Sequence, residues 1–405
     1  MTRPERLKLN PRLLFWAKTL NEVKALNAVV ALFYLSRGVT IEQIFYFSIV
    51  WSLTEIIFEI PTGFLADKFG RKAMMILGGV LQVLSFAATF FAHGFLQFIG
   101  VFILMALAYA CFSGTEEALL YDSLKELNQE HTMTKENGRL HAARSLAKIF
   151  IPALGAFVAR DLLDWQFNIL IAVNVVMAMA ALVIMFFFKE PRHFEDVAAY
   201  EIGIFRESIR TIRAEPFLFR AAMNKLLIFI GSLIVWRAYQ PYFSAHSMSS
   251  IWLIAYYIIC HIIIFSGHWN VSIIVKKIGA PRLMTWTILG TIVSLAAAYF
   301  SVAKWLIFLS LLLPLIFEGV REPVFSHSIN RLIHSRSRAT TLSNLNLLQS
   351  IFEIPLMAAA GLLVRWRLEY TFLLAAALCL AVLLFFPIRV RDLAEPAVRE
   401  ELEVG

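Results

Sequence analysis

Long apolar segments recur along the whole of this 405-residue chain, and they constrain its fold more than any other feature. A helix needs about 20 apolar residues to cross the hydrocarbon core of a bilayer. The sequence therefore predicts an all-α membrane protein with twelve transmembrane helices in two six-helix halves. The predicted spans lie at 12–36, 40–66, 71–92, 95–122, 139–160, 165–188, 217–238, 250–275, 281–301, 303–325, 340–363 and 369–388.

The composition supports a membrane protein rather than a soluble one. Hydrophobic residues make up 59% of the chain and charged residues only 16%, whereas about 25% of a soluble domain is charged. The net charge of +8 sits mostly in short loops between apolar segments, so we expect no nucleic-acid partner. Cys111, Cys260 and Cys379 lie inside apolar segments, which argues against disulfides and metal sites. We expect no cofactor.

One segment, 189–216, is long enough to separate two halves of the chain. The sequence predicts an N-terminal six-helix half at 1–188, a cytoplasmic linker at 189–216 and a C-terminal six-helix half at 217–405. The linker contains "YEIGIFRESIRTIRAEP", an amphipathic pattern typical of a helix that lies on the membrane surface.

The distribution of lysine and arginine predicts the orientation. Most of the 37 basic residues lie in the N-terminal segment, the loops that follow even-numbered spans, and the C-terminal segment. Basic residues near the ends of spans mark the cytoplasmic side. We therefore expect a multi-pass protein of the cell inner (cytoplasmic) membrane with both termini in the cytoplasm.

Ionisable residues follow a three-helix period. The spans at 71–92, 165–188, 281–301 and 369–388 carry none within their apolar parts, and the other eight carry at least one. A charge at bilayer depth is expensive and usually faces a bundle interior or an aqueous cavity. We expect the charge-free helices to face lipid and the others to surround a cavity.

Two acidic residues on the second span are candidates for proton coupling. Glu55 and Glu59 are four residues apart and share a helix face. Two carboxylates close together in a low dielectric resist joint ionisation, so one tends to hold a proton. The alternative is a permanent ion pair with Lys148 or Arg144, which lie one turn apart on the fifth span.

The two halves resemble each other locally, which adds two further proton-coupling candidates. "GTEEALLYDSL" aligns with "GVREPVFSHSI" and matches Glu117 to Glu322, and "VKKIGAPR" weakly repeats the segment that joins the second and third spans. Other polar residues within spans are candidates for the substrate cavity, where the cations either neutralise acids or bind an anionic substrate: Asn21, Glu22, Lys24, Asn27, Arg144, Lys148, Arg321 and Glu353.

Aromatic residues and histidines on the seventh and eighth spans have simpler interpretations. His261 and His268 indicate helix packing or gating rather than metal binding. An aromatic cluster on the seventh span indicates an interfacial belt, with substrate stacking as the alternative: Trp236, Tyr239, Tyr242 and Phe243.

The short segment between the second and third spans carries a recognisable motif. "GFLADKFGRK" resembles the loop 2–3 signature of the major facilitator superfamily, and the stretches "EIPTGFLADKFGRK" and "SGTEEALLYDSL" are similar to a bacterial subgroup labelled as efflux proteins. The resemblance covers nearly the whole chain and implies a major facilitator fold and a monomer. The motif residues are Gly63, Asp67, Lys68, Gly70, Arg71 and Lys72.

By this resemblance the motif is a conformational latch. Asp67 would face the positive N-terminal end of a neighbouring helix, which the family makes the eleventh span. Arg71 can pair with Asp122 at the cytoplasmic end of the fourth span. Contacts made in one state and broken in the other would hold the outward-open form. The alternative is that these charges only enforce topology.

These features favour a secondary active transporter that works by alternating access and exports a small organic molecule in exchange for protons. The alternative is transport of an anionic metabolite or siderophore by proton symport or uniport, with Lys24, Lys148 and Arg321 as its ligands. Pro152-x-x-Gly155 only partly resembles the proline-glycine motif of family antiporters. An enzyme is not expected, because the sequence has no His-x4-Asp pair and no nucleotide-binding loop.

Overall fold

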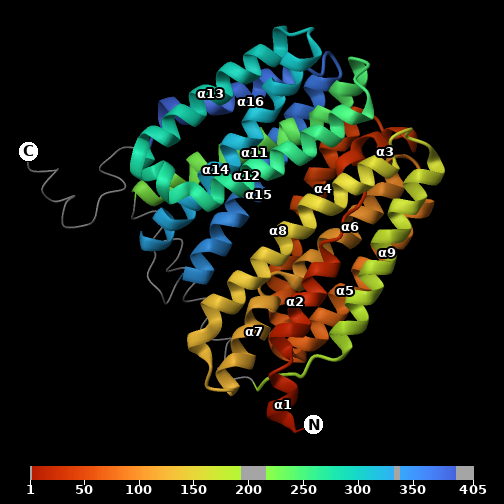
Figure 1. Cartoon of the computed structure of the whole chain (residues 1–405), viewed down its shortest axis with the longest axis vertical. Coiled ribbons are helices and arrows are strands. Elements are labelled where there is room, and N and C mark those ends of the chain that lie inside the picture. Colours follow the sequence, from red (N-terminus) through yellow and green to blue (C-terminus); the bar gives the residue numbers. More distant parts are fainter. Residues whose placement is uncertain (1, 193–215, 333–337, 389–405) are drawn as a thin grey trace, which may run out of the picture. The chain divides into compact units, whose positions relative to one another are not determined.

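The computed structural model describes residues 2–192, 216–332 and 338–388. Within these ranges every regular element is a helix (Figure 1). The chain divides into two compact units, Met1–Ala199 with Leu253–Ile258, and Tyr200–Trp252 with Ile259–Gly405. The linker expected at 189–216 lies almost wholly outside the described residues, so the three-part division of the sequence stays a prediction.

The first unit is built on nine described α-helices and two short 3-10 turns, Asn27–Val29 and Glu130–Thr132. α5 packs against α6 and α9, α4 packs against α6, and α2 packs against α8 and α9. The helices are α1 (Arg3–Leu7), α2 (Asn10–Asn21), α3 (Val30–Ser36), α4 (Ile41–Phe69), α5 (Arg71–Phe91), α6 (Gly94–Phe112), α7 (Thr115–Glu126), α8 (Met133–Val158) and α9 (Asp164–Phe186).

The second unit contains the remaining described helices, except for Leu253–Ile258 of α12. α13 packs against α14 and α16, and α11 packs against α14 and α16. Its core includes buried Leu218 and Ala221 of α11 beside Met284 of α13 and Phe325 of α14. The helices are α11 (Pro216–Ala245), α12 (Ser250–Ile278), α13 (Ala280–Phe300), α14 (Lys304–Leu332), α15 (Arg338–Val364) and α16 (Tyr370–Phe385).

The twelve predicted spans each coincide with a helix or a broken helix. Eight described helical segments are long and apolar enough to cross a membrane, and two shorter apolar helices, Asn27–Ser36 and Tyr370–Phe385, accompany them. This pattern confirms an all-helical, multi-pass membrane protein and is consistent with the count of twelve. The fourth predicted span is α6 followed by α7, and the break falls at Gly114, whose φ is +69°.

The first predicted span is also broken, which the sequence did not predict. Helix α2 ends at Asn21, and helical structure resumes only at Asn27. Oδ1 of Asn174 on α9 accepts a hydrogen bond from the backbone N–H of Ala25 at 2.8 Å. A Cβ at Gly155 of α8 would collide with the carbonyl oxygen of Ala25. The break is therefore held by one side chain and one close backbone approach.

A single glycine joins α4 to α5, and another joins α12 to α13. Gly70 has φ +97° and Gly279 has φ +85°, conformations that glycine adopts without steric cost. Each glycine N–H bonds back to the carbonyl four residues earlier, at 3.0 Å to Ala66 and 2.8 Å to Val275. The weak sequence echo between the two halves thus corresponds to the same sharp turn.

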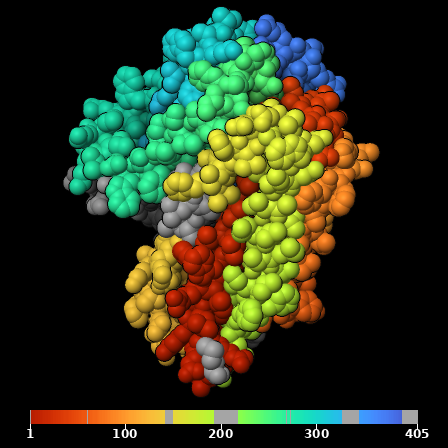
Figure 2. All heavy atoms as spheres, turned by 45° about the vertical axis from the view of Figure 1, so that its right-hand side comes forward, coloured from red at the N-terminus to blue at the C-terminus, as the bar shows by residue number. Residues whose placement is uncertain are grey.

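The charge-free helices each expose an apolar residue at every seventh position, which keeps these residues on one face of a helix. α9 runs along the surface of the first unit in Figure 2 and exposes Ile169, Val176 and Val183. Such faces suit contact with lipid. The corresponding exposed residues are Leu77, Leu84 and Phe91 on α5, Trp286, Val293 and Phe300 on α13, and Leu373 and Leu380 on α16.

Candidate functional site

The charged motif at the α4–α5 turn forms a compact network with α7. Nη1 of Arg71 lies 2.6 Å from Oδ1 of Asp67, and Nε of Arg71 lies 3.8 Å from Oδ2 of Asp122. Thus the structure brings Asp67, Arg71 and Asp122 together. Lys68 instead points its ammonium towards the ring of Phe69, 5.5 Å from the centroid. A side chain at Gly63 would meet no atom within 4 Å.

Glu190, which follows α9, completes this network and was missed by sequence reasoning. Its Oε1 accepts the backbone N–H of Arg71 and its Oε2 accepts that of Lys72, each at 2.7 Å. A carboxylate at a helix N-terminus satisfies unpaired N–H groups and opposes the positive end of the helix dipole. The carboxyl carbon would also lie 2.8 Å from a Cβ at Gly70. The sequence shows only an acidic residue at the start of the expected linker, about 120 residues after Arg71, and nothing in it indicates a helix cap.

The start of the chain is tied to the same side of the first unit. Arg3 donates from Nε to Oε1 of Glu126 at 2.5 Å and from Nη2 to the carbonyl of Glu190 at 3.1 Å. The bond to Glu126 raises the pKa of the Arg3 guanidinium. Asn10 donates to Ser123 Oγ at 2.8 Å and to the carbonyl of Lys189 at 2.7 Å. These bonds join α1, α2 and α7 to the residues that follow α9.

Each unit pairs a lysine on its first long helix with a glutamate at its fourth predicted span. Lys18 of α2 pairs with Glu116 of α7, where both side chains are largely buried. Nζ of Lys225 on α11 lies 3.0 Å from Oε1 of Glu322 on α14. The sequence alignment had matched Glu117 to Glu322, but in the structure Glu117 is exposed and Glu116 makes the ion pair.

Other predicted residues of the first unit lie at or near the break in the first span. Asn21, Lys24 and Asn27 are half-buried, and Nζ of Lys24 lies 3.8 Å from Oε2 of Glu22. Asn21, Lys24 and Asn27 do not lie on one continuous helix face, because the helix is interrupted between Asn21 and Asn27.

The remaining acidic candidates lie on two helices. Glu55 and Glu59 are half-buried on α4 and both take part in interactions within the chain. Glu353 of α15 is buried and also has a partner. Arg144 and Lys148 belong to residues 141–149, whose side chains lie outside the described residues. The proton-holding pair and the ion pair to the fifth span both stay predictions.

Arg321 lies inside the second unit, with 2% of its surface exposed. Its Nη1 donates to the carbonyl of Met284 at 2.8 Å and to Oγ1 of Thr287 at 2.9 Å, and its Nη2 donates to Oδ1 of Asn224 at 2.6 Å. Its guanidinium carbon also lies 5.3 Å from the ring centroid of Phe325. These contacts join α14 to α11 and α13 and leave the guanidinium facing protein groups.

The aromatic cluster on α11 is not an interfacial belt as a whole. Tyr239, Tyr242 and Phe243 are fully buried, and the ring of Tyr242 packs 5.0 Å from that of Phe372 on α16. The belt interpretation is wrong for these three residues, because a belt residue must reach the membrane surface. Trp236 is half-buried and has a different environment.

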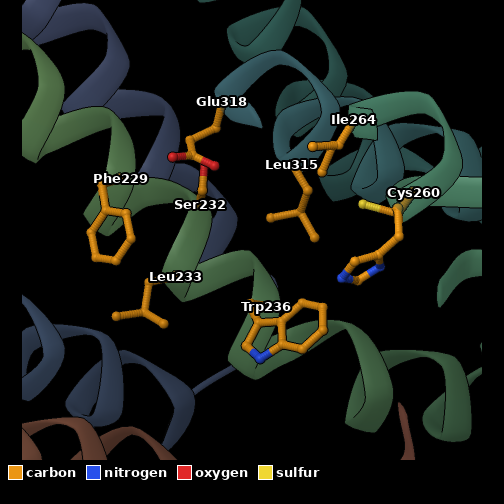
Figure 3. Close-up of a pocket in the computed structure, with 9 residues that line it drawn as sticks. Phe229, Ser232, Leu233, Trp236, Cys260, Ile264, Leu315 and Glu318 are labelled. Atoms are coloured by element: carbon orange, nitrogen blue, oxygen red, sulfur yellow. The ribbon is translucent and has the colours of Figure 1, made fainter. Parts of the chain in front are cut away.

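Trp236 lines a cavity of about 200 Å3 within the second unit (Figure 3). The figure shows the Trp236 ring of α11 and the Glu318 carboxylate of α14 directed into the same pocket. In the sequence, Glu318 lies on the tenth predicted span, one of the eight that carry ionisable residues, and nothing there distinguishes it from the others. Three helices contribute the lining, which consists of Phe229, Ser232, Leu233 and Trp236 from α11, Cys260, His261 and Ile264 from α12, and Leu315 and Glu318 from α14.

Solved structures of similar architecture are transporters. The chain resembles a D-xylose-proton symporter with a TM-score of 0.69 at 15% identity, covering 96% of this chain and 98% of that one. It resembles the nucleoside transporter NupG with a TM-score of 0.73 at 13% identity, covering 94% and 98%. A bacterial homolog of the human lysosomal transporter Spinster gives a TM-score of 0.65 at 15% identity, covering 97% and 98%. At these identities the likeness shows the fold alone.

A curated relative and a family model extend the comparison. The multi-drug resistance efflux pump PmrA homolog of Lactococcus lactis subsp. lactis (strain IL1403) is 25% identical over 172 residues, which cover 42% of this chain and 40% of that protein. The chain thus spans about two fifths of the length of this relative. The family model described as "Major Facilitator Superfamily" matches residues 22–352, most of the chain. This helical, multi-pass membrane protein therefore belongs to the Major Facilitator Superfamily and is a transporter rather than an enzyme.

Proposed function

We propose that this transporter exports a small organic molecule across the cell inner membrane in exchange for protons. The observation that carries the proposal is the pairing of acidic and basic side chains between helices of each unit, Lys18 with Glu116 and Lys225 with Glu322. The name of the curated relative, an efflux pump, supports export. The name of one protein of the same fold, a proton symporter, supports coupling to protons.

In this proposal Glu322 is the principal proton carrier of the second unit. Its side chain is 41% exposed and that of Lys225 is 34% exposed, so water and protons reach the pair. Protonation of Glu322 cancels its negative charge and weakens its attraction to Lys225, so α14 can move away from α11. Glu55 and Glu59 serve the same role on α4 of the first unit.

The α4–α5 network is proposed to act as the latch of alternating access. Polar contacts of Arg71 on α5 connect four parts of the first unit. They reach Asp67 on α4, Asp122 on α7 and Glu190 after α9. Contacts of this kind can be broken and remade together, because water can replace either partner of each charged group when the helices move apart. We place this network and both termini on the cytoplasmic side, as the distribution of basic residues predicts, and propose that the protein works as a monomer.

Transport of an anionic metabolite or siderophore has less support. That alternative needs cations that face a substrate. The guanidinium of Arg321 donates instead to Met284, Thr287 and Asn224 of its own unit, and Nζ of Lys24 lies 3.8 Å from Glu22.

Proton coupling is tested in everted membrane vesicles with an imposed pH gradient and a pH-sensitive dye. Addition of lipophilic drugs, organic anions and siderophores in turn should release protons for at least one compound with the wild type. We expect Glu322→Gln and Glu59→Gln to abolish this release, while Asp161→Asn, an exposed control, leaves it unchanged. Substrate-triggered proton movement that persists in both variants would contradict proton coupling through these acids.

A further inference from the structure

We propose that the pocket lined by α11, α12 and α14 binds a small organic monocation, one aromatic or alkyl group carrying one protonated amine or quaternary ammonium. This inference rests on the proposed function and gives the cargo a chemical class. It comes from the charge, the aromatic faces and the size of the pocket, taken in turn.

Glu318 gives the pocket its negative charge. In the part of the chain that the structure describes, its carboxylate makes no hydrogen bond or ion pair, and the side chain lines the cavity. The neighbouring cations are already committed, because Lys225 pairs with Glu322 and Arg321 donates to α11 and α13. A carboxylate among apolar side chains attracts a cation strongly, since little water competes for it.

Aromatic rings supply a second attraction for a cation. Phe229 and Trp236 both line the pocket from α11 (Figure 3). The Trp236 ring is held by its neighbours, with centroids 6.4 Å from His261 and 5.4 Å from Tyr239. A cation over an aromatic face is attracted by the negative charge density of the ring, and tryptophan is the best partner. This attraction needs no hydrogen-bond donor on the ligand, so it accepts a quaternary ammonium.

Size and polarity exclude other ligand classes. A cavity of about 200 Å3 is smaller than the roughly 300 Å3 at the lower end of common ligand sites, so it suits one ring with one charged head. A sugar or a nucleoside needs many polar partners. Here the polar side-chain groups are those of Ser232, Cys260, His261 and Glu318 and the indole N–H of Trp236, and the rest of the lining is apolar. An anion would face the carboxylate of Glu318.

Equilibrium binding to the purified full-length protein tests the inference. Phenyltrimethylammonium is the probe, N,N-dimethylaniline is its neutral near-isostere at mildly alkaline pH, and benzoate is the anion of similar size. Isothermal titration calorimetry should detect binding of phenyltrimethylammonium. The affinity of the protein for N,N-dimethylaniline and for benzoate should each be at most one tenth of its affinity for the cation. Glu318→Gln should weaken cation binding at least tenfold, and Trp236→Leu should weaken it several-fold.

Glu130→Gln is the matched control, because Glu130 is an exposed glutamate of the other unit; it should bind like the wild type. Size-exclusion chromatography and the thermal-unfolding midpoint establish that each variant is folded, and Glu318→Asp serves as a second variant that keeps the charge if Glu318→Gln does not fold. Equal affinity for phenyltrimethylammonium and N,N-dimethylaniline, or unchanged cation binding in Glu318→Gln, would overturn the inference.

The vesicle assay separates this inference from the proposed function. Cation binding that depends on Glu318, without any proton-coupled movement of cations, would leave the site standing and reject proton-coupled export. Proton-coupled movement of other compounds, with no binding of the cation, would reject the site and leave the proposed function standing.

Discussion

Both carboxylate oxygens of Glu190 accept backbone N–H groups at the start of α5, and the first of these belongs to Arg71, whose N–H lies 2.7 Å from Oε1. The same arginine reaches Asp67 on α4 with its side chain. Arg71 therefore binds two acids, Glu190 through its backbone N–H and Asp67 through its guanidinium. We expect the stability of the α4–α5 turn to depend on both contacts.

Removing the cap should destabilise the protein measurably. Glu190→Ala leaves the N–H groups of Arg71 and Lys72 without their acceptor, and loss of such a cap costs about 1 kcal/mol. The measurement is the thermal-unfolding midpoint in detergent, with Glu130→Ala, an exposed position, as the control. A midpoint unchanged relative to that control would contradict the capping role.

A methyl group at each of the two glycine turns separates backbone strain from steric collision. Gly70 and Gly279 both have φ near +90°, where any other residue costs about 1 to 3 kcal/mol. A Cβ at Gly70 would also meet the Glu190 carboxylate at 2.8 Å, whereas at Gly279 it would meet nothing within 4 Å. Gly70→Ala should therefore destabilise more than Gly279→Ala. Chemical-denaturation midpoints that fall equally would show that Glu190 moves aside freely.

The two lysine–glutamate pairs should contribute unequally to stability. The side chains of Lys18 and Glu116 are 13% and 15% exposed, and those of Lys225 and Glu322 are 34% and 41% exposed. Breaking a buried pair costs about 3 to 5 kcal/mol, but an exposed pair contributes about 1 kcal/mol or less. Glu116→Gln should lower the unfolding midpoint more than Glu322→Gln. The reverse order would mean that the exposed fractions misjudge the local dielectric.

Arg321 should be required for folding rather than for substrate binding. Arg321→Lys cannot serve Met284, Thr287 and Asn224 from one ammonium as the planar guanidinium does. Loss of a charged hydrogen bond costs about 1.5 to 3 kcal/mol, so the yield of monodisperse protein should fall. Arg282→Lys on the exposed face of α13 is the control. A well-folded Arg321→Lys with weakened anion transport would favour an anionic cargo instead.

If the α4–α5 network is a latch, Asp67→Asn and Asp122→Asn should slow transport to different extents. Asp67 lies 2.6 Å from Arg71 and Asp122 lies 3.8 Å from it. Asp67→Asn should slow transport by roughly tenfold, which corresponds to about 1.4 kcal/mol in the barrier, and Asp122→Asn should slow it less. Initial rates in vesicles, normalised to the amount of protein, provide the comparison. Wild-type rates in a well-expressed Asp67→Asn would mean that these charges only enforce topology.

The helices could be predicted because a membrane span needs about 20 consecutive apolar residues, which is a property of the local sequence. The breaks within the spans could not be predicted in this way. The interruption after Asn21 depends on Asn174 of α9 and on the close approach of Gly155 to Ala25. Those partners are distant in sequence, and no periodicity within the first span reveals them. The predicted motif at 63–72 identified Arg71 and Asp122 as neighbours, but Glu190 lies far along the chain, in a region taken as a linker.

The pocket was the hardest feature to predict. Phe229, Leu233 and Trp236 recur at helical spacing, but the same pattern describes any buried helix face. Glu318 and His261 become informative only when α14 and α12 place them beside Trp236. A charge in an apolar helix indicates a functional group, but its partners come from tertiary packing.

All nine residues around the pocket belong to the second unit (Figure 3). A ligand held by that unit alone gains the same free energy in every conformation that preserves the arrangement of α11, α12 and α14. Equal affinity for two states shifts the balance between them in neither direction, however tight the binding. The residues that bind the cargo must then differ from the residues through which the cargo shifts the conformational equilibrium. A mutation can therefore remove one of these effects and leave the other intact.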